Sequence, residues 1–128
     1  MTTEIKTLCI GPNGHIADAA KILEANIQKI CFVVDNDDVL LGTITDGDIR
    51  RGLLKGNAFD APAKNIMNAS PRTFTEDHDR SALRTMMLDQ GILHVPIIDE
   101  HQHFIGLVTL DELMLDESHN DNWVVLMA

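Results

Sequence analysis

The chain has 128 residues, 45% of them hydrophobic and only 4% aromatic, which is enough for a globular core without disulfides or metals. Ten Lys and Arg against 20 Asp and Glu give a net charge of -10, which disfavours a nucleic-acid surface or an anionic membrane as partner. All ten basic residues lie between Lys6 and Arg84, whereas residues 85–128 contain Asp and Glu but no Lys or Arg. Anion binding would therefore use cations from the first two thirds of the chain.

The sequence shows no apolar leader and no apolar run as long as a membrane span. Cys9 and Cys31 lie among apolar residues, which is typical of small buried thiols and not of a disulfide framework. We therefore expect a cytoplasmic protein.

The first half of the chain predicts a β-α-β-β-α unit. Its expected elements are an extended piece at 7–10, a helix with an apolar face over 16–27, strands at 30–34 and 39–43 around a polar turn, and a short helix up to residue 54. Thr45 or Asp46 is the expected N-cap of the short helix, and Gly56 is expected to end it.

The second half repeats this pattern, because a shift of 64 positions aligns the two halves without a gap. Residues 32–35 fall on 96–99, and residues 41–45 fall on 105–109. The elements expected here are an extended piece at 72–74, a helix between Asp79 and Gly91, strands at 95–98 and 104–108, and a short helix at 110–115. A self-repeat of this length indicates two copies of one supersecondary unit.

An α+β fold follows, in which two β-α-β-β-α repeats pack sheet to sheet about a pseudo-twofold axis. Helices cover one face of each three-stranded sheet, so the bare faces are expected to cover each other. We assign residues 1–60 to the first motif and residues 61–117 to a linker and the second motif. Residues 118–128 are assigned to a further linker and the start of a following domain.

Each repeat ends on a glycine, two further strand residues (Thr-Ile in the first repeat and Leu-Val in the second), a threonine and, three positions later, an acid, at 42–48 and 106–112. Together with the linker at 65–71 and the segment at 93–99, this pattern resembles a tandem pair of cystathionine-β-synthase (CBS) domains over roughly residues 5–116. The resemblance implies a regulatory module that binds AMP, ADP, ATP or S-adenosylmethionine in clefts between the copies. It also implies a homodimer that controls an attached enzyme or channel.

In that family the motif's threonine and acid contact the ribose and, in part, the phosphate, and a basic residue before the buried strand meets the phosphate. Carried onto this chain, with the cations that follow the first motif, the implied ligand-binding residues are Lys29, Thr45, Asp48, Arg50, Arg51, His94, Thr109 and Glu112. Glu112 stands where aspartate is usual and no cation follows it, so we expect the first site to be the more competent.

A structural interpretation of the same residues stays open. Thr45 and Asp46 would cap a helix in any protein, and an acid such as Asp48 is favoured in a first turn by the helix dipole. Arg50 and Arg51 would, in this interpretation, be solvated or paired with neighbouring acids.

Other motifs are weaker. His101 and His103 have the spacing of a metal pair, but they fall in a turn without a third ligand, so we predict no metal site. The acidic turn at 35–38 lacks the spacing of a calcium loop. No arrangement of nucleophile and base is evident, so we expect no catalysis by this module and no required cofactor.

The run at 123–128 has a buried-strand pattern with no counterpart in the repeat. It resembles the opening strand of sugar-phosphate nucleotidyltransferases, although a terminal strand that packs on the module is the alternative. The prediction is therefore a nucleotide-sensing module fused to an enzyme, expected to be a nucleotidyltransferase. The alternative function is a dimerisation platform with empty nucleotide sites.

Overall fold

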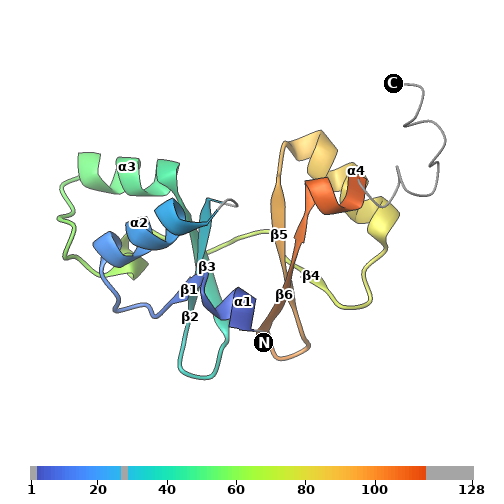
Figure 1. Ribbon diagram of the computed structural model, residues 1–128, viewed down its shortest axis with the longest axis horizontal. Helices are drawn as coiled ribbons and strands as arrows, with labels where there is room; N and C mark the ends of the chain where they lie inside the picture. Colours follow the sequence, from blue (N-terminus) through green and yellow to red (C-terminus); the bar gives the residue numbers. More distant parts are fainter. Residues whose placement is uncertain (1–2, 27–28, 115–128) are drawn as a thin grey trace.

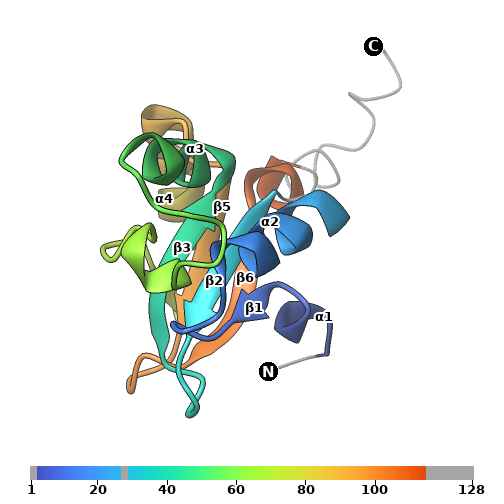
Figure 2. The same ribbon diagram turned by 90° about the vertical axis from the view of Figure 1, so that its left-hand side faces the viewer.

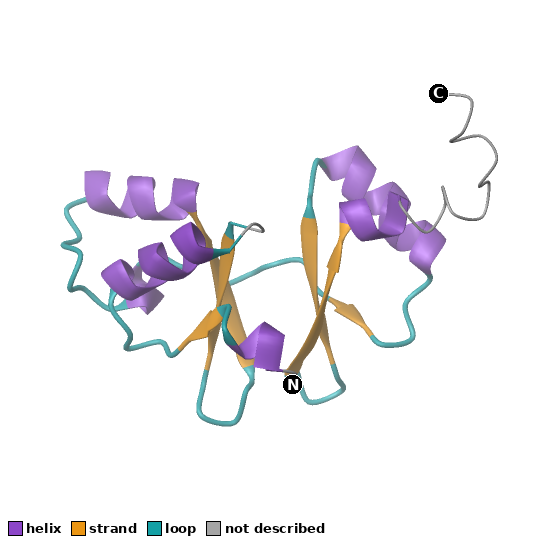
Figure 3. Ribbon diagram, viewed as in Figure 1, coloured by secondary structure: helices purple, strands orange, loops and turns teal. Residues whose placement is uncertain are grey.

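The computed structural model describes residues 3–26 and 29–114, which form two similar halves (Figure 1). The first half contains α1 (Thr3–Lys6), β1 (Cys9–Ile10), α2 (Ile16–Ala25), β2 (Ile30–Val34), β3 (Leu40–Thr45) and α3 (Asp46–Leu54). The linker then forms the 3-10 turn η1 (Ala63–Asn65), which packs on the core of the first half. The second half contains β4 (Phe74–Thr75), α4 (Arg80–Gln90), β5 (His94–Ile98), β6 (Phe104–Thr109) and the helical residues 110–114. The predicted order of elements is confirmed, and Figure 3 distinguishes the helices and strands of the two halves by colour. The expectations for Ile27 and for 115–128 lie outside the described residues.

Each half is built on a three-stranded sheet with the same topology. The middle strand, β2 or β5, pairs in parallel with β1 or β4 and antiparallel with β3 or β6. Ile30 pairs with Thr45 in the first sheet, and His94 pairs with Thr109 in the second. These residues are 64 positions apart, so the sequence repeat holds down to the pairing register.

The apolar run of β2 is explained by burial on both faces, since all five of its residues are buried. Successive side chains of a strand point to opposite faces. Cys31 and Val33 belong to the core of the first half with α2, whereas Phe32 belongs to a core that includes Phe104 of β6. The strand therefore contributes to two cores at once.

The two sheets face each other, with α2 and α3 outside the first sheet and α4 outside the second, while α1 lies between the sheets (Figure 1). Figure 2 views the molecule from the side of α2 and α3. One core lies within each half, and a third core joins the sheets through Phe32 and Phe104, whose ring centroids are 4.4 Å apart. This arrangement confirms the predicted sheet-to-sheet packing of an α+β pair.

The hairpin turns of the two halves are hydrogen-bonded to each other at one end of the molecule. Leu40 donates its backbone N–H to the carbonyl of Gln102 at 3.0 Å, and Phe104 donates to the carbonyl of Asp38 at 2.9 Å. Asp38 and Gln102 share a left-handed backbone, with φ of 65° and 68°. The repeat symmetry thus extends to this contact between the turns.

Cys31 is fully buried and Cys9 is partly buried, and both thiols are free. Burial raises the pKa of Cys31 to about 12 and that of Cys9 to about 11, so both are protonated at neutral pH. Among the residues that the structure describes, no helix is long and apolar enough to cross a membrane.

Candidate functional site

A cleft of about 440 Å³ lies between the two halves, and both halves and the linker contribute to its walls. It is lined by Lys29, Ile30, Thr43, Thr45, Asn68, Pro71, Arg72, Ile92, Leu93, His94 and Pro96. Three residues that the sequence singled out, Lys29, Thr45 and His94, therefore meet in one cavity. Its volume is within the range of small-molecule sites.

Strand geometry explains why the two threonines share a wall of the cleft. Thr43 and Thr45 are two positions apart on β3, so their side chains point to the same face of the sheet. Ile30 pairs with Thr45 across the sheet, and Lys29 precedes Ile30 at the start of β2. His94 occupies the equivalent position to Ile30 at the start of β5. The starts of the two middle strands thus face the same cleft.

The linker is joined to β3 by backbone hydrogen bonds next to the cleft. Thr43 donates its N–H to the carbonyl of Asn68 at 3.1 Å, and Asn68 donates back to the carbonyl of Thr43 at 2.8 Å. Gly42 makes this approach possible, since a Cβ there would lie 2.6 Å from the Asn68 carbonyl oxygen. Pro71 and Arg72 are placed in the cleft wall by this attachment.

Thr45, Asp48 and Arg51 form a hydrogen-bonded network at the N-terminus of α3. One carboxylate oxygen of Asp48 accepts from the Thr45 backbone N–H at 3.0 Å and from the Thr45 hydroxyl at 3.1 Å. The other oxygen accepts from Arg51 Nη2 at 2.8 Å. The capping role that the sequence left open is therefore present, and it holds the carboxylate directly behind the threonine of the cleft wall.

The second motif is arranged differently. The Thr109 hydroxyl accepts the backbone N–H of Glu112 at 3.1 Å, and Glu112 is exposed. The first motif forms a full capping box, in which the Thr45 side chain accepts the backbone N–H of Asp48 and the Asp48 carboxylate accepts that of Thr45. The two motifs thus present different polar groups to their surroundings.

The charges at the cleft favour an anionic ligand. Lys29 and Arg72 are the cationic side chains among the lining residues described, and no carboxylate is among them. Burial lowers the pKa of His94, although Asp111 acts in the opposite direction. The lowered pKa favours the neutral imidazole, which can still form a hydrogen bond.

Sequence reasoning did not assign several residues of the cleft, among them Asn68, Arg72 and Leu93. Arg50, which it did assign, lines a different hollow between α2 and α3, and Arg51 is paired with Asp48. Arg72 could have been noticed in the sequence as a cation directly after the linker proline. Its position in the cleft wall, however, depends on the pairing of the linker with β3, which is distant in the sequence.

The histidines of the second hairpin have neighbours of their own. His103 Nδ1 lies 2.8 Å from a carboxylate oxygen of Asp99, and the backbone N–H groups of His101 and His103 donate to the other oxygen. In the described part of the chain, no group of three His, Cys, Asp or Glu side chains is arranged to hold a metal ion.

A comparison with protein-family models matches the CBS domain at residues 1–55 and 63–116. The chain belongs to the CBS domain family. The CBS pair predicted from the repeat is thereby confirmed.

The curated relatives of this CBS pair include enzymes. A protein of Haemophilus influenzae named "Probable arabinose 5-phosphate isomerase" is 30% identical over 110 residues, which are 84% of this chain and 32% of the relative. An uncharacterised 17.7 kDa protein of Acidianus ambivalens is 29% identical over 108 residues, covering 84% of this chain and 65% of the relative. The chain spans about a third of the isomerase that it matches, and the relative's name is that of an isomerase and not of a nucleotidyltransferase.

Solved structures of CBS pairs have the same fold. CBSX2 in complex with AMP superposes with a TM-score of 0.76 at 17% identity, over 88% of each chain. The CBS pair of protein MJ0100, in complex with 5'-methylthioadenosine and S-adenosyl-L-methionine, superposes with a TM-score of 0.73 at 26% identity, over 88% of this chain and 89% of that one. Both neighbours hold adenosine-containing ligands.

Proposed function

We propose that this CBS pair binds an adenosine-containing ligand (AMP, ADP, ATP or S-adenosylmethionine) in the cleft between its halves and thereby regulates an attached enzyme. The observation that carries the proposal is the cleft itself. Its walls combine two hydroxyls, two cations and apolar side chains in a volume of about 440 Å³. An MJ0100 CBS pair of 26% identity holds ligands of this class.

Each part of such a ligand has a counterpart in the cleft or directly behind its wall. The Thr45 hydroxyl and the Asp48 carboxylate behind it are suited to ribose hydroxyls, because a hydroxyl donates and accepts and a carboxylate accepts. Lys29 and Arg72 are suited to a phosphate. Ile30, Ile92 and Leu93 offer apolar surface to the base. In this proposal Thr109 and Glu112 serve a weaker second site.

The attached enzyme is proposed to act on a sugar phosphate. The matched segment covers only 32% of each of two relatives named as arabinose 5-phosphate isomerases, which suggests that such an enzyme accompanies this pair. The run at 123–128 instead suggests a nucleotidyltransferase, and both candidates share a sugar phosphate as substrate class. We keep the boundaries at 1–60, 61–117 and 118–128 as part of this proposal, with no catalysis by the pair itself.

Isothermal titration with AMP, ADP, ATP and S-adenosylmethionine tests the proposal. We expect at least one ligand to bind, Asp48→Ala to weaken it about tenfold or more, and Glu112→Ala to leave the stronger site unchanged. Arg72→Ala should weaken AMP and leave adenosine unaffected, because adenosine carries no phosphate.

Equal losses in Asp48→Ala and Glu112→Ala would contradict the proposed difference between the sites. If no nucleotide binds at millimolar concentration while the chain still self-associates, the module is a dimerisation platform and the sensing role is wrong.

A further inference from the structure

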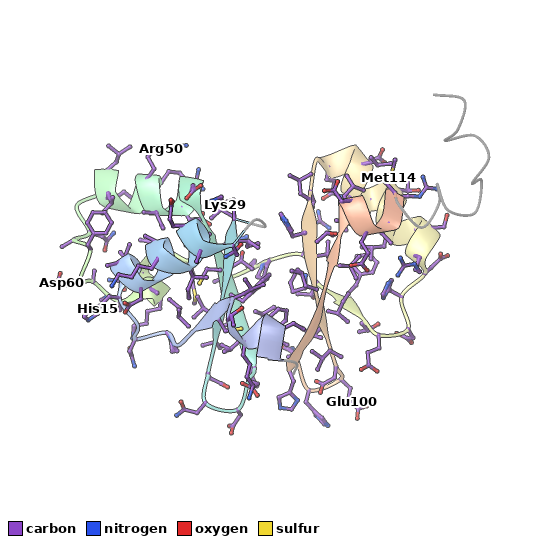
Figure 4. The ribbon with its side chains drawn as sticks, viewed as in Figure 1. His15, Lys29, Arg50, Asp60, Glu100 and Met114 are labelled. Atoms are coloured by element: carbon purple, nitrogen blue, oxygen red, sulfur yellow. The ribbon has the colours of Figure 1, made fainter. Side chains whose placement is uncertain are left out.

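Arg51 folds back along the first turn of α3 onto the acid of the first motif. Its Nη2 donates to Asp48 Oδ1 at 2.8 Å. The guanidinium lies over Gly47, since a Cβ on this glycine would be 3.0 Å from Arg51 Nη1. Its neighbour Arg50 points away from the sheets (Figure 4) and lines the hollow between α2 and α3. Of these two arginines, Arg51 is therefore the one that is connected to the wall of the cleft.

The proton of the Thr45 hydroxyl is committed to Asp48. An ionised carboxylate only accepts, so the 3.1 Å contact between Thr45 Oγ1 and Asp48 Oδ2 uses the hydroxyl proton. The same Oγ1 accepts the backbone N–H of Asp48 in the capping box. These two bonds use the donor and one of the two lone pairs of the hydroxyl, which leaves one lone pair. Thr45, which lines the cleft, therefore offers an acceptor to a ligand and no donor.

Arg51 completes the hydrogen bonding of the Asp48 carboxylate. Oδ2 accepts from the Thr45 backbone N–H at 3.0 Å and from its hydroxyl, while Oδ1 accepts from Arg51. Both ends of the carboxylate are thus held, so its rotation is fixed, and with it the direction of the Thr45 proton. The Arg51 side chain is 60% exposed, and an ion pair at such a site contributes little to stability. Its effect is on orientation.

The second repeat lacks this chain of hydrogen bonds. The residue 64 positions after Arg51 is Leu115, and the residue equivalent to Gly47 is Asp111. The acid of the second motif, Glu112, is exposed. The sequence therefore places no cation where Arg51 holds the acid of the first motif, and the two threonines of the motifs are not supported in the same way.

We infer that Arg51 is a positioning residue for the recognition of a ribose and not a phosphate ligand. Through Asp48 it keeps the Thr45 hydroxyl as an acceptor, so this point of the cleft selects a ligand that donates an O–H. The ribose hydroxyls of a nucleoside are such donors, whereas the oxygens of an ionised phosphate accept. Contacts with a phosphate are left to Lys29 and Arg72. This role of Arg51 rests on the proposed function.

Isothermal titration of the full chain with adenosine, AMP and 2′,3′-dideoxyadenosine tests this role. Arg51→Ala should raise the Kd of adenosine and of AMP by the same factor, about three- to tenfold, which is the effect of one hydrogen bond. The Kd of dideoxyadenosine, which lacks both ribose hydroxyls, should change by less than about twofold. Arg51→Lys should recover most of the affinity, because an ammonium group also donates to Asp48.

A double-mutant cycle tests whether Arg51 acts through Asp48. In the Asp48→Ala background, Arg51→Ala should change the Kd of adenosine by about twofold or less, because the carboxylate that it orients is gone. Lys55→Ala is the matched control, since it removes one exposed positive charge from the C-cap of the same helix. It should leave all three dissociation constants unchanged, and circular dichroism should show that all variants are folded.

Three results would overturn the positioning role of Arg51. An Arg51→Ala variant that weakens AMP and leaves adenosine unchanged, as expected for Arg72→Ala, would make Arg51 a phosphate ligand. Unchanged binding of all three ligands, or additive losses in the cycle, would show that Arg51 does not act on the ribose through Asp48. In each of these cases the wild type still binds AMP and the proposed function stands. A wild type that binds neither adenosine nor AMP would contradict the proposed function and this role together.

Discussion

The two motif glycines occupy the same repeat position, yet their surroundings differ. A Cβ on Gly42 would lie 2.6 Å from the Asn68 carbonyl oxygen and 2.8 Å from Met67 Sδ. A Cβ on Gly106 would first meet the Ile97 Cβ at 3.7 Å, which is an ordinary contact. The linker thus makes a glycine necessary in the first repeat, where it also positions the cleft wall.

We therefore expect Gly42→Ala to lower the free energy of unfolding by about 1–3 kcal/mol, because the linker must move to accommodate the methyl group. Gly106→Ala should change it by less than about 1 kcal/mol, since alanine fits and reduces the entropy of the unfolded chain. Urea denaturation followed by circular dichroism measures both. Equal destabilisation by the two substitutions would mean that the close approach of the linker does not restrict position 42.

At the scale of the elements, α4 has a well-defined N-cap. One carboxylate oxygen of Asp79 accepts the backbone N–H of Ser81 at 2.9 Å and that of Ala82 at 3.3 Å. These N–H groups have no partner within the helix. Asp79→Ala should therefore cost about 1 kcal/mol of stability.

Asp89→Ala is the matched control for this cap. Asp89 is exposed near the C-terminus of α4, where a negative charge is unfavourable to the helix dipole. Its removal should leave the urea midpoint unchanged or slightly higher. If Asp79→Ala and Asp89→Ala shift the midpoint equally, capping by Asp79 does not stabilise α4.

Most elements could be predicted because their signals are local. The β-branched run of β2 and the Asp79 and Gly91 boundaries of α4 each depend on neighbouring residues only. The short α1 and η1 were not predicted, since three or four residues carry no periodicity. The second strand was expected at 39–43 but runs over 40–45, because Ile44 and Thr45 still pair with β2.

The residues of the cleft could be predicted only in part, because some of them are brought together by contacts between segments that are far apart in the sequence. Thr45 and Lys29 could be assigned because the repeat and the family pattern mark them. Arg72 reaches the cleft only through the pairing of Asn68 with Thr43, which no local pattern encodes. Arg50 was expected near a phosphate, but its helix position turns it to the hollow between α2 and α3.

At the scale of the whole molecule, the two halves are joined by a core that neither could form alone. Phe104 of β6 is 1% exposed and packs on Phe32 of β2, together with Leu8, Ile30 and Val34 of the first half. Each half also has a core of its own. The shared core couples the unfolding of the two halves and holds the walls of the cleft at their separation.

Phe104→Ala should therefore lower the free energy of unfolding by about 3–5 kcal/mol, the usual cost of removing a buried phenylalanine ring. Phe104→Leu keeps apolar volume between the sheets and should cost clearly less. Because the cleft lies between the halves, Phe104→Ala should also weaken AMP binding. Asp79→Ala is the control, since it destabilises α4 away from the shared core and should leave AMP binding unchanged. Urea denaturation and isothermal titration on the same samples measure both effects. A Phe104→Ala variant that unfolds like Phe104→Leu and binds AMP like the wild type would show that the shared core does not set the geometry of the cleft.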